Sequence, residues 1–381
     1  MLHTSDWHLG RQFHNVSLLE DQRHVLEQIV AIVRERGVEV VLVAGDIYDR
    51  SVPPAEAVQL LDEVVHRLSA ECGVPLILIA GNHDGAERLG FGARQLARAG
   101  VHISGPLGPE PAPVILQDAH GPVAFYPLPY AEPATVRSQL GLEVQGHEQA
   151  MRALTARIRA HNGDARRSVL IAHCFLDGFA ACESERPLSI GGVETVPAEC
   201  FDGFDYVALG HLHGPQARSA QHLRYSGSIL KYSFSEENQR KSVTLVDMDA
   251  RGCCSVEQVA LRPRRDLRVL EGDLADLLER GRRDSAAQDY LLVRLQDRHA
   301  ILDPMGKLRA VYPNVLHIER PVLQAASGAV GARVDHRKVS DLDLFASFFA
   351  DVTGKVLDDG QRGGLAGVLQ RVENAAREVE A

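Results

Sequence analysis

Short apolar runs separated by amphipathic segments constrain the fold of this chain most strongly. Two runs rich in Val, Leu and Ile, at 38–44 and 74–80, flank a segment at 54–72 whose apolar residues recur at helical spacing. A second amphipathic segment covers 16–36. Because alternating strands and helices form parallel sheets with helices on their faces, this half of the chain predicts an α/β fold.

Strands dominate the region that follows. A helix is expected over 145–162, and the Gly- and Pro-rich stretch 101–130 is expected to hold short strands at a sheet edge. Further strands are expected over 168–173, 205–210, 222–226, 242–248 and 254–261. Together these elements predict two sheets packed face to face, with helices outside.

The composition changes at the Arg-rich stretch 261–268, LRPRRDLR, which suggests that the chain is divided into several domains. We expect the two-sheet α/β domain to cover 1–261. A small α/β domain in the order β-α-β-α-β is expected over 262–320, a linker over 321–339, and two C-terminal helices over 340–381.

Charge and composition narrow the functional classes. The 381 residues carry a formal net charge of −10, so any contact with nucleic acid must rest on local positive features. No apolar stretch approaches the ~20 residues of a membrane helix. The first residues, MLHTSDWHLG, lack the apolar core of a signal peptide, so we expect a cytoplasmic protein with no membrane partner. The six cysteines form no C-x-x-C pair and are expected to be thiols.

Five of the apolar runs end in Asp, Asn or His. The first ends in DWH, the second in GD and the third in GNHD, and two later runs end in a lone His and in GHLH. Ligands of open α/β sheets bind at the carboxyl ends of strands, so one site assembled from all five ends is the simplest interpretation. The candidate ligands are Asp6, His8, Asp46, Asn82, His173, His211 and His213.

The types of these side chains indicate the chemistry. Carboxylate, imidazole and amide oxygen together suit divalent ions such as Mn²⁺, Fe²⁺ or Zn²⁺, and the motifs contain no thiolate of a structural zinc site. Seven ligands are too many for one tetrahedral ion, but two ions that share a bridging carboxylate would use them all. Such two-metal sites commonly hydrolyse phosphate esters.

Each motif taken alone also has an ordinary explanation. Asp6 could cap a helix, Asp46 could lie in a turn, and His173 could be a core histidine. A buried strand rarely ends in three successive polar residues, as at 82–84. It also rarely ends in two histidines, as on either side of Leu212. The joint occurrence of all five motifs favours a common site. The other twelve histidines have no motif context and are expected to be structural or solvated.

In this order, HTSDWHLG, VAGDIYDR, IAGNHD, ALGHLHG and YSGS resemble the calcineurin-like metallophosphoesterase superfamily, and most closely its double-strand-break repair nuclease family. The resemblance covers roughly residues 1–260 by motif. It implies a DNA nuclease with double-strand exonuclease and single-strand or hairpin endonuclease activity. It also implies a homodimer that acts with an SbcC-type SMC ATPase in DNA repair, recombination and replication, in the nucleoid.

The resemblance also assigns roles to individual residues. It implies two divalent ions per chain, with Mn²⁺ expected, one held by Asp6, His8, Asp46 and His213 and the other by Asp46, Asn82, His173 and His211. His83 would contact the scissile phosphate, and Asp84 would orient His83. Some relatives carry a second phosphate-contacting histidine where this chain has Asp49.

Candidate contacts with DNA and partners are less specific. The resemblance implies that 262–320 is a capping domain that binds DNA, and its arginines could grip the phosphate backbone or simply form a solvated run. The candidates are Arg262, Arg264, Arg265 and Arg268, with Arg11 as a weaker one. Helices over 86–99 and 145–162 are implied at the homodimer interface. An apolar stripe in the tail could dock on the ATPase or pack within the chain; it comprises Leu342, Leu344, Phe345, Phe348 and Phe349.

Two other functions remain compatible with the same ligands. One is a phosphatase or cyclic-nucleotide phosphodiesterase, although such an enzyme has no need of the DWHLG context or the residues after 261. The other is a mainly structural subunit that tethers DNA, although the complete ligand set together with His83 argues against an inactive site.

Overall fold

The computed structural model describes residues 1–162, 167–186, 188, 195–217, 221–321, 342–343, 345–346, 349–350 and 354–368. The chain forms two compact units, Met1–Asp266 and Leu267–Ala381. Nearly all of the predicted linker and much of the predicted C-terminal helices, including Leu344 and Phe348, lie outside the described residues. Within those residues, no helix has both the length and the apolar character needed to cross a membrane. All six cysteines are free thiols.

The first unit contains two six-stranded sheets. The first sheet has the order β16-β15-β1-β4-β5-β6, in which β1, β4, β5 and β6 run parallel and β15 and β16 are antiparallel additions. The strands are β1 (Leu2–Thr4), β4 (Val41–Val43), β5 (Leu76–Ile79), β6 (Val101–Ser104), β15 (Ser242–Met248) and β16 (Cys254–Ala260).

The second sheet repeats this plan. Its order is β13-β14-β12-β9-β8-β7, with β8, β9, β12 and β14 parallel and an antiparallel strand at each edge. The strands are β7 (Val114–Asp118), β8 (Gly121–Pro127), β9 (Arg167–His173), β12 (Tyr206–Gly210), β13 (Gln216–Ala217) and β14 (Leu223–Tyr225). Consistent with prediction, the stretch 101–130 supplies the edge strands β6 and β7.

The two sheets pack face to face through an apolar layer. Alternate residues of both sheets meet in it, among them Leu42 and Ile77 from the first sheet and Val169, Ile171 and Ala208 from the second. All five are buried. The intervening residues of these strands point outward and are also buried, which is why the strands read as continuous apolar runs in the sequence. The predicted two-sheet sandwich is therefore confirmed.

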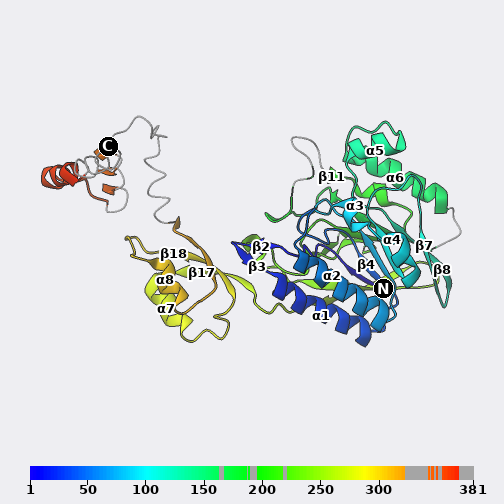
Figure 1. Ribbon diagram of the computed structural model, residues 1–381, viewed down its shortest axis with the longest axis horizontal. Helices are drawn as coiled ribbons and strands as arrows, with labels where there is room; N and C mark the ends of the chain where they lie inside the picture. Colours follow the sequence, from blue (N-terminus) through cyan, green and yellow to red (C-terminus); the bar gives the residue numbers. More distant parts are fainter. Residues whose placement is uncertain are drawn as a thin grey trace. The chain divides into compact units, whose positions relative to one another are not determined.

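Helices cover the outer faces of the sandwich (Figure 1). They are α1 (Leu19–Glu35), α2 (Ala55–His66), α5 (Pro133–Leu140) and α6 (His147–Asn162), and α2 continues as a π-helical turn, η1 (Arg67–Glu71). Leu154 and Ile158 of α6 belong to the same apolar cluster as Leu170 and Leu209 of the second sheet. The helical spacing of the apolar residues thus buries one face of each helix.

Shorter elements connect these layers, and one of them differs from prediction. The segment 86–99 was expected as one helix, but it forms α3 (Ala86–Leu89), α4 (Ala93–Leu96) and the 3₁₀ turn η2 (Ala97–Ala99). Gly92 adopts φ +75°, a left-handed conformation that interrupts the helix. The remaining elements are β2 (Gln12–Phe13), β3 (Val16–Ser17), β10 (Phe175–Leu176), β11 (Thr195–Val196), η3 (Ala198–Phe201) and η4 (Phe234–Glu236).

The second unit is a small α/β domain. Its elements follow the predicted order: β17 (Leu267–Gly272), α7 (Leu274–Gly281), β18 (Tyr290–Leu295), α8 (Pro304–Arg309) and β19 (Val315–Glu319). The three strands are parallel in the order β17-β18-β19. Its core includes Leu277, Leu291, Val293 and Leu308, all at 3% exposure or less.

Candidate metal centre

The loops that follow five parallel strands meet at one end of the sandwich. The loops after β1 and β4 run side by side, since the amides of Asp6 and His8 donate to the carbonyl oxygens of Gly45 and Asp46, at 3.0 and 2.9 Å. Opposite them, the amide of His211, just after β12, donates to both carboxylate oxygens of Asp6, at 3.0 and 3.2 Å. The structure therefore brings together segments more than two hundred residues apart in the sequence.

The first candidate metal position comprises Asp6, His8, Asp46 and His213. One ligand atom from each of Asp6, His8 and His213 lies within 4.8 Å of the others. His8 Nε2 is 3.1 Å from His213 Nε2 and 3.6 Å from Asp46 Oδ2. All four side chains are buried, so their donor atoms point at one another rather than at solvent.

The second candidate metal position comprises Asp46, Asn82, His173 and His211. His173 Nε2 lies 2.8 Å from Asn82 Oδ1 and 3.6 Å from Asp46 Oδ2. His211 Nδ1 lies 3.3 Å from the same amide oxygen of Asn82. Asp46 Oδ2 therefore reaches both positions, and all seven predicted ligands lie around one centre.

The backbone is strained at these ligands. Of the seven non-glycine residues with positive φ in the described part of the chain, four are predicted ligands: Asp6 (52°), His8 (46°), Asp46 (50°) and His211 (105°). Such conformations cost on the order of 1–3 kcal/mol each and cluster at functional sites. Their concentration here indicates that the fold sacrifices local stability to aim these side chains.

The glycines that precede the motifs allow this close approach. A Cβ on Gly81 would lie 2.1 Å from Asp46 Oδ1 and 2.3 Å from the Asp46 amide nitrogen. A Cβ on Gly210 would lie 1.9 Å from the carbonyl oxygen of Ala44. A larger residue at Gly81 must therefore push Asp46 out of place, and one at Gly210 must push the backbone of Ala44, which follows β4.

We expect Gly81→Ala to lower the free energy of unfolding by about 1–3 kcal/mol, because the added methyl overpacks the loop against Asp46. It should also weaken binding of Mn²⁺. Thermal unfolding and Mn²⁺ titration would measure the two effects. Gly146→Ala is the matched control, since a Cβ there has nothing within 4 Å. Equal behaviour of the two variants would contradict the steric argument.

Electrostatics make the centre suitable for cations. Burial raises the pKa of Asp6 well above its ordinary value, and the charge of Asp46 raises it further. Burial likewise raises the pKa of Asp46 to about 6 and lowers the pKa values of His173 and His213 to about 4. Two buried carboxylates beside neutral imidazoles lack the positive charge that would stabilise their ionised form. Divalent cations supply that charge, so these residues fit the metals predicted from the motifs.

His83 borders both positions, and Asp84 has a different role from the one predicted. His83 Nε2 lies 4.0 Å from Asp46 Oδ2, and its Nδ1 lies 2.9 Å from the carbonyl oxygen of Asp49. The Asp84 carboxylate accepts hydrogen bonds from the amides of Ile47, Tyr48 and Gly81, at 2.9–3.0 Å. The prediction that Asp84 orients the His83 ring is therefore wrong. Asp84 ties the loop after β4 to the loop after β5, and a backbone carbonyl orients His83.

Several residues around His213 were not predicted. Ser184 Oγ lies 2.7 Å from His213 Nδ1, and Glu185 accepts a hydrogen bond of 2.7 Å from the His213 amide. Glu236 and Lys241 form a buried ion pair behind Ser184. None of the four stands in a metal-ligand spacing, so the sequence carried no local signal for them.

The predicted DNA-binding arginines fall into two groups. Arg268 forms ion pairs with Asp284 and Asp289 of its own unit, at 2.9 and 2.7 Å, and Arg265 lies 3.6 Å from Asp21. Arg262 and Arg264 are exposed. Arg11 lies over the Tyr232 ring at 5.0 Å and 3.3 Å from Asp49 Oδ1. Arg262 and Arg264 therefore retain the most accessible charge.

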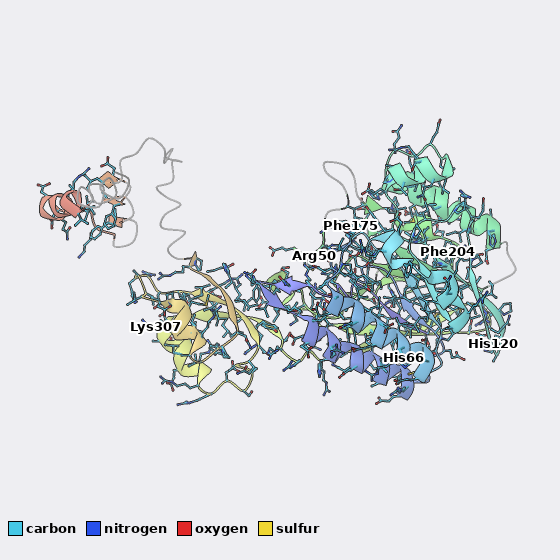
Figure 2. The ribbon with its side chains drawn as sticks, viewed as in Figure 1. Arg50, His66, His120, Phe175, Phe204 and Lys307 are labelled. Carbon is cyan, nitrogen blue, oxygen red and sulfur yellow. The ribbon has the colours of Figure 1, made fainter. Side chains whose placement is uncertain are left out.

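Two further side chains, both labelled in Figure 2, lie next to residues of the centre in contact or in sequence. Phe175, on β10 two residues after His173, places its ring centroid 6.0 Å from that of His211. Arg50 follows Asp49, and its side chain is 66% exposed. The centre thus has an aromatic neighbour on one side and an exposed cation next to Asp49.

Comparisons with known proteins show which families this chain resembles. Residues 1–215 match the model of the calcineurin-like phosphoesterase family, and residues 263–353 match the type 5 capsule protein repressor C-terminal domain. Proteins named as the D subunit of nuclease SbcCD, from Staphylococcus epidermidis and Staphylococcus saprophyticus, are 34% and 32% identical over 362 residues, which is 95% of this chain and 95% of each relative. Among solved structures, a dimetal phosphatase from Danio rerio is 14% identical with a TM-score of 0.40, covering 69% of this chain and 98% of that one.

Proposed function

Because the chain belongs to the calcineurin-like phosphoesterase family and, within it, to the family of nuclease SbcCD D subunits, we propose that it is a metal-dependent DNA nuclease acting with an SbcC-type ATPase. The observation that carries this proposal is the position of Asp46 Oδ2, which lies 3.6 Å from His8 of one metal position and 3.6 Å from His173 of the other. A shared carboxylate of this kind suits two ions that act on one phosphodiester.

These ligands would hold two divalent ions, and we propose Mn²⁺ for both. When bound, the ions polarise the phosphate and lower the pKa of a water molecule. Asp6 and Asp46 together contribute a charge of −2, which leaves the centre positive once two divalent ions are present and allows it to attract a phosphate. The acidic net charge of the chain is thus overcome locally.

His83 is the group that we assign to proton transfer at the leaving oxygen. Its Nδ1 faces a carbonyl oxygen, which can only accept, so Nδ1 carries a hydrogen in every protonation state. The proton that His83 gains or loses is therefore on Nε2, the atom that faces the metal positions. A protonated Nε2 would donate to the leaving oxygen of the DNA strand.

Contacts with the rest of the DNA would come from arginines. We assign Arg262 and Arg264 to the phosphate backbone first, since their side chains are exposed. Arg11, Arg265 and Arg268 would have to exchange an existing carboxylate partner for a phosphate, which makes their contribution smaller. Backbone contacts of this type give affinity without sequence specificity.

The assembly that we propose is a homodimer that associates with an SbcC-type SMC ATPase in the cytoplasm, at the nucleoid. The segments 86–99 and 145–162 would form the dimer interface, and the C-terminal residues, with Phe345 and Phe349, would dock on the ATPase. Both faces include exposed apolar side chains, since Phe91 is 86% and Phe345 44% exposed. The complex would process DNA ends and hairpins in repair, recombination and replication.

A nuclease assay on an end-labelled linear duplex tests the proposal. We expect cleavage with Mn²⁺, none after EDTA treatment, recovery when Mn²⁺ is restored, and stimulation by the SbcC partner with ATP. A chromogenic phosphomonoester serves as the comparison substrate. Rapid hydrolysis of the monoester with the DNA left intact would instead identify a phosphatase.

A further inference from the structure

The two metal positions differ in what lies behind their histidines, and we infer that they differ in affinity. The first position, formed by Asp6, His8, Asp46 and His213, binds a divalent ion more tightly and fills before the second. Carboxylates behind His8 and His213 strengthen these two ligands, and Asp49, Ser184 and Glu236 are positioning residues for them. This inference rests on the two-metal centre of the proposed function.

A hydrogen-bonded chain of defined direction supports His213. Its Nε2 faces His8, and its Nδ1 lies 2.7 Å from Ser184 Oγ. The Ser184 hydroxyl in turn donates to Glu236 Oε1 at 2.5 Å, so the serine oxygen must accept from His213 Nδ1–H. The hydrogen is thereby fixed on Nδ1, and the lone pair of Nε2 points into the first position. Glu236 Oε1 itself lies 3.5 Å from His213 Nδ1, so a carboxylate stands directly behind this ligand.

A buried lysine forms an ion pair with the carboxylate of this chain. Glu236 is fully buried, and Lys241 is 6% exposed. Lys241 Nζ donates to Glu236 Oε2 and also to the carbonyl oxygen of His213 at 2.8 Å. The ion pair therefore fixes both the side chain and the backbone of this ligand.

His8 also has a carboxylate near its Nδ1, but the two groups are slightly too far apart for a hydrogen bond. Its Nδ1 is fully buried and has no hydrogen-bond partner among the described residues. The carboxylate closest to this atom is Asp49 Oδ1, at 3.6 Å, a short movement from hydrogen-bond distance. Arg11 holds Asp49 at 3.3 Å and donates to the Ser184 carbonyl oxygen at 3.3 Å. The acid at position 49, which replaces the histidine of some relatives, thus gains a role as the partner of His8.

The second position has no such support. His173 Nδ1 lies 2.9 Å from the carbonyl oxygen of Ala44, a neutral acceptor. Within the described ranges, no carboxylate oxygen lies within 4 Å of a ring nitrogen of His211, and the only one this close to His173 is that of Asp46, itself a ligand. A carboxylate behind a histidine raises the basicity of the ligand, and its loss typically costs 10–100-fold in metal affinity. The first position therefore has the stronger imidazole ligands.

Titration of the metal-free full-length protein with Mn²⁺, followed by electron paramagnetic resonance and calorimetry, tests this difference. We expect two phases in the wild type, the first at least about tenfold tighter. Ser184→Ala should weaken the first phase about tenfold and Glu236→Gln up to about 100-fold, with the second phase unchanged. Asp49→Asn should also weaken the first phase. Glu237→Gln and Asp62→Asn are the matched controls, and neither should alter either phase.

The outcomes separate the possible failures. Glu236→Gln leaves Lys241 buried without its partner and can fail to fold, whereas Ser184→Ala keeps the ion pair and tests the same link. Two equal phases in the wild type, or a second phase weakened more than the first by Ser184→Ala and Asp49→Asn, would overturn this inference alone. A wild type that binds no Mn²⁺ would instead overturn the proposed function. Thermal unfolding in EDTA distinguishes weaker binding from general instability.

Discussion

Replacing Asp46 with asparagine (Asp46→Asn) is expected to remove both metal ions and all measurable nuclease activity. Asp46 Oδ2 is the oxygen that approaches His8 of the first position and His173 of the second. The substitution takes away the negative charge that both ions share, while the amide keeps the size of the side chain. Loss of a ligand should exceed the roughly 100-fold upper limit for residues that only support ligands.

The measurement is Mn²⁺ stoichiometry together with cleavage of an end-labelled duplex. Asp202→Asn, an exposed position outside the centre, controls for the charge change. Circular dichroism should show that Asp46→Asn is folded. A variant that still binds two ions, or still cuts DNA at the wild-type rate, would contradict the assignment of Asp46 as the bridging residue.

Replacing His83 with asparagine should separate catalysis from metal binding. His83 belongs to neither ligand set, and its Nε2 faces the centre from 4.0 Å away. We expect His83→Asn to retain both ions and to lower kcat by about 10²–10⁴-fold, the usual contribution of a general acid or base. Asparagine can still donate to the Asp49 carbonyl oxygen, but it cannot deliver a proton to the leaving oxygen.

Single-turnover cleavage at saturating Mn²⁺ measures this effect, with the Mn²⁺ titration run in parallel. His66→Asn, an exposed histidine at the end of α2 that is labelled in Figure 2, is the matched control. If His83→Asn lost the metals along with activity, His83 would be a structural residue. If activity persisted, proton transfer would have to come from another group.

The two-sheet sandwich could be predicted because the patterns that specify its strands and helices lie within short stretches of sequence. The runs at 38–44 and 74–80 are apolar on both faces, as strands buried on both sides must be, and 54–72 has the spacing of a helix with one buried face. The convergence of the candidate ligands could be predicted for a related reason. These residues directly follow buried strands, and parallel strands bring their carboxyl ends to one edge of a sheet.

What the sequence did not reveal depends on contacts between distant segments. Nothing near Glu236 indicates that it lies behind Ser184 and His213, because that contact exists only after the second sheet and the loop at 182–186 are in place. The role of Asp84 was misjudged because its position next to His83 suggested a contact between their side chains. Adjacent residues on a loop point in different directions, and the carboxylate instead binds the amides of Ile47 and Tyr48.

The two sheets contribute different parts of the centre. Ligands up to Asn82 follow strands of the first sheet, and His173, His211 and His213 follow strands of the second. The spacing between these two groups is set by the thickness of the apolar layer, which includes Ile77 and Ile171. Ions that span the gap would cross-link one end of the sandwich, so a sliding movement of one sheet against the other would pull the ligands apart. Hydrogen exchange in the loops after β5 and β12, which carry Asn82 and His211, would report such shear.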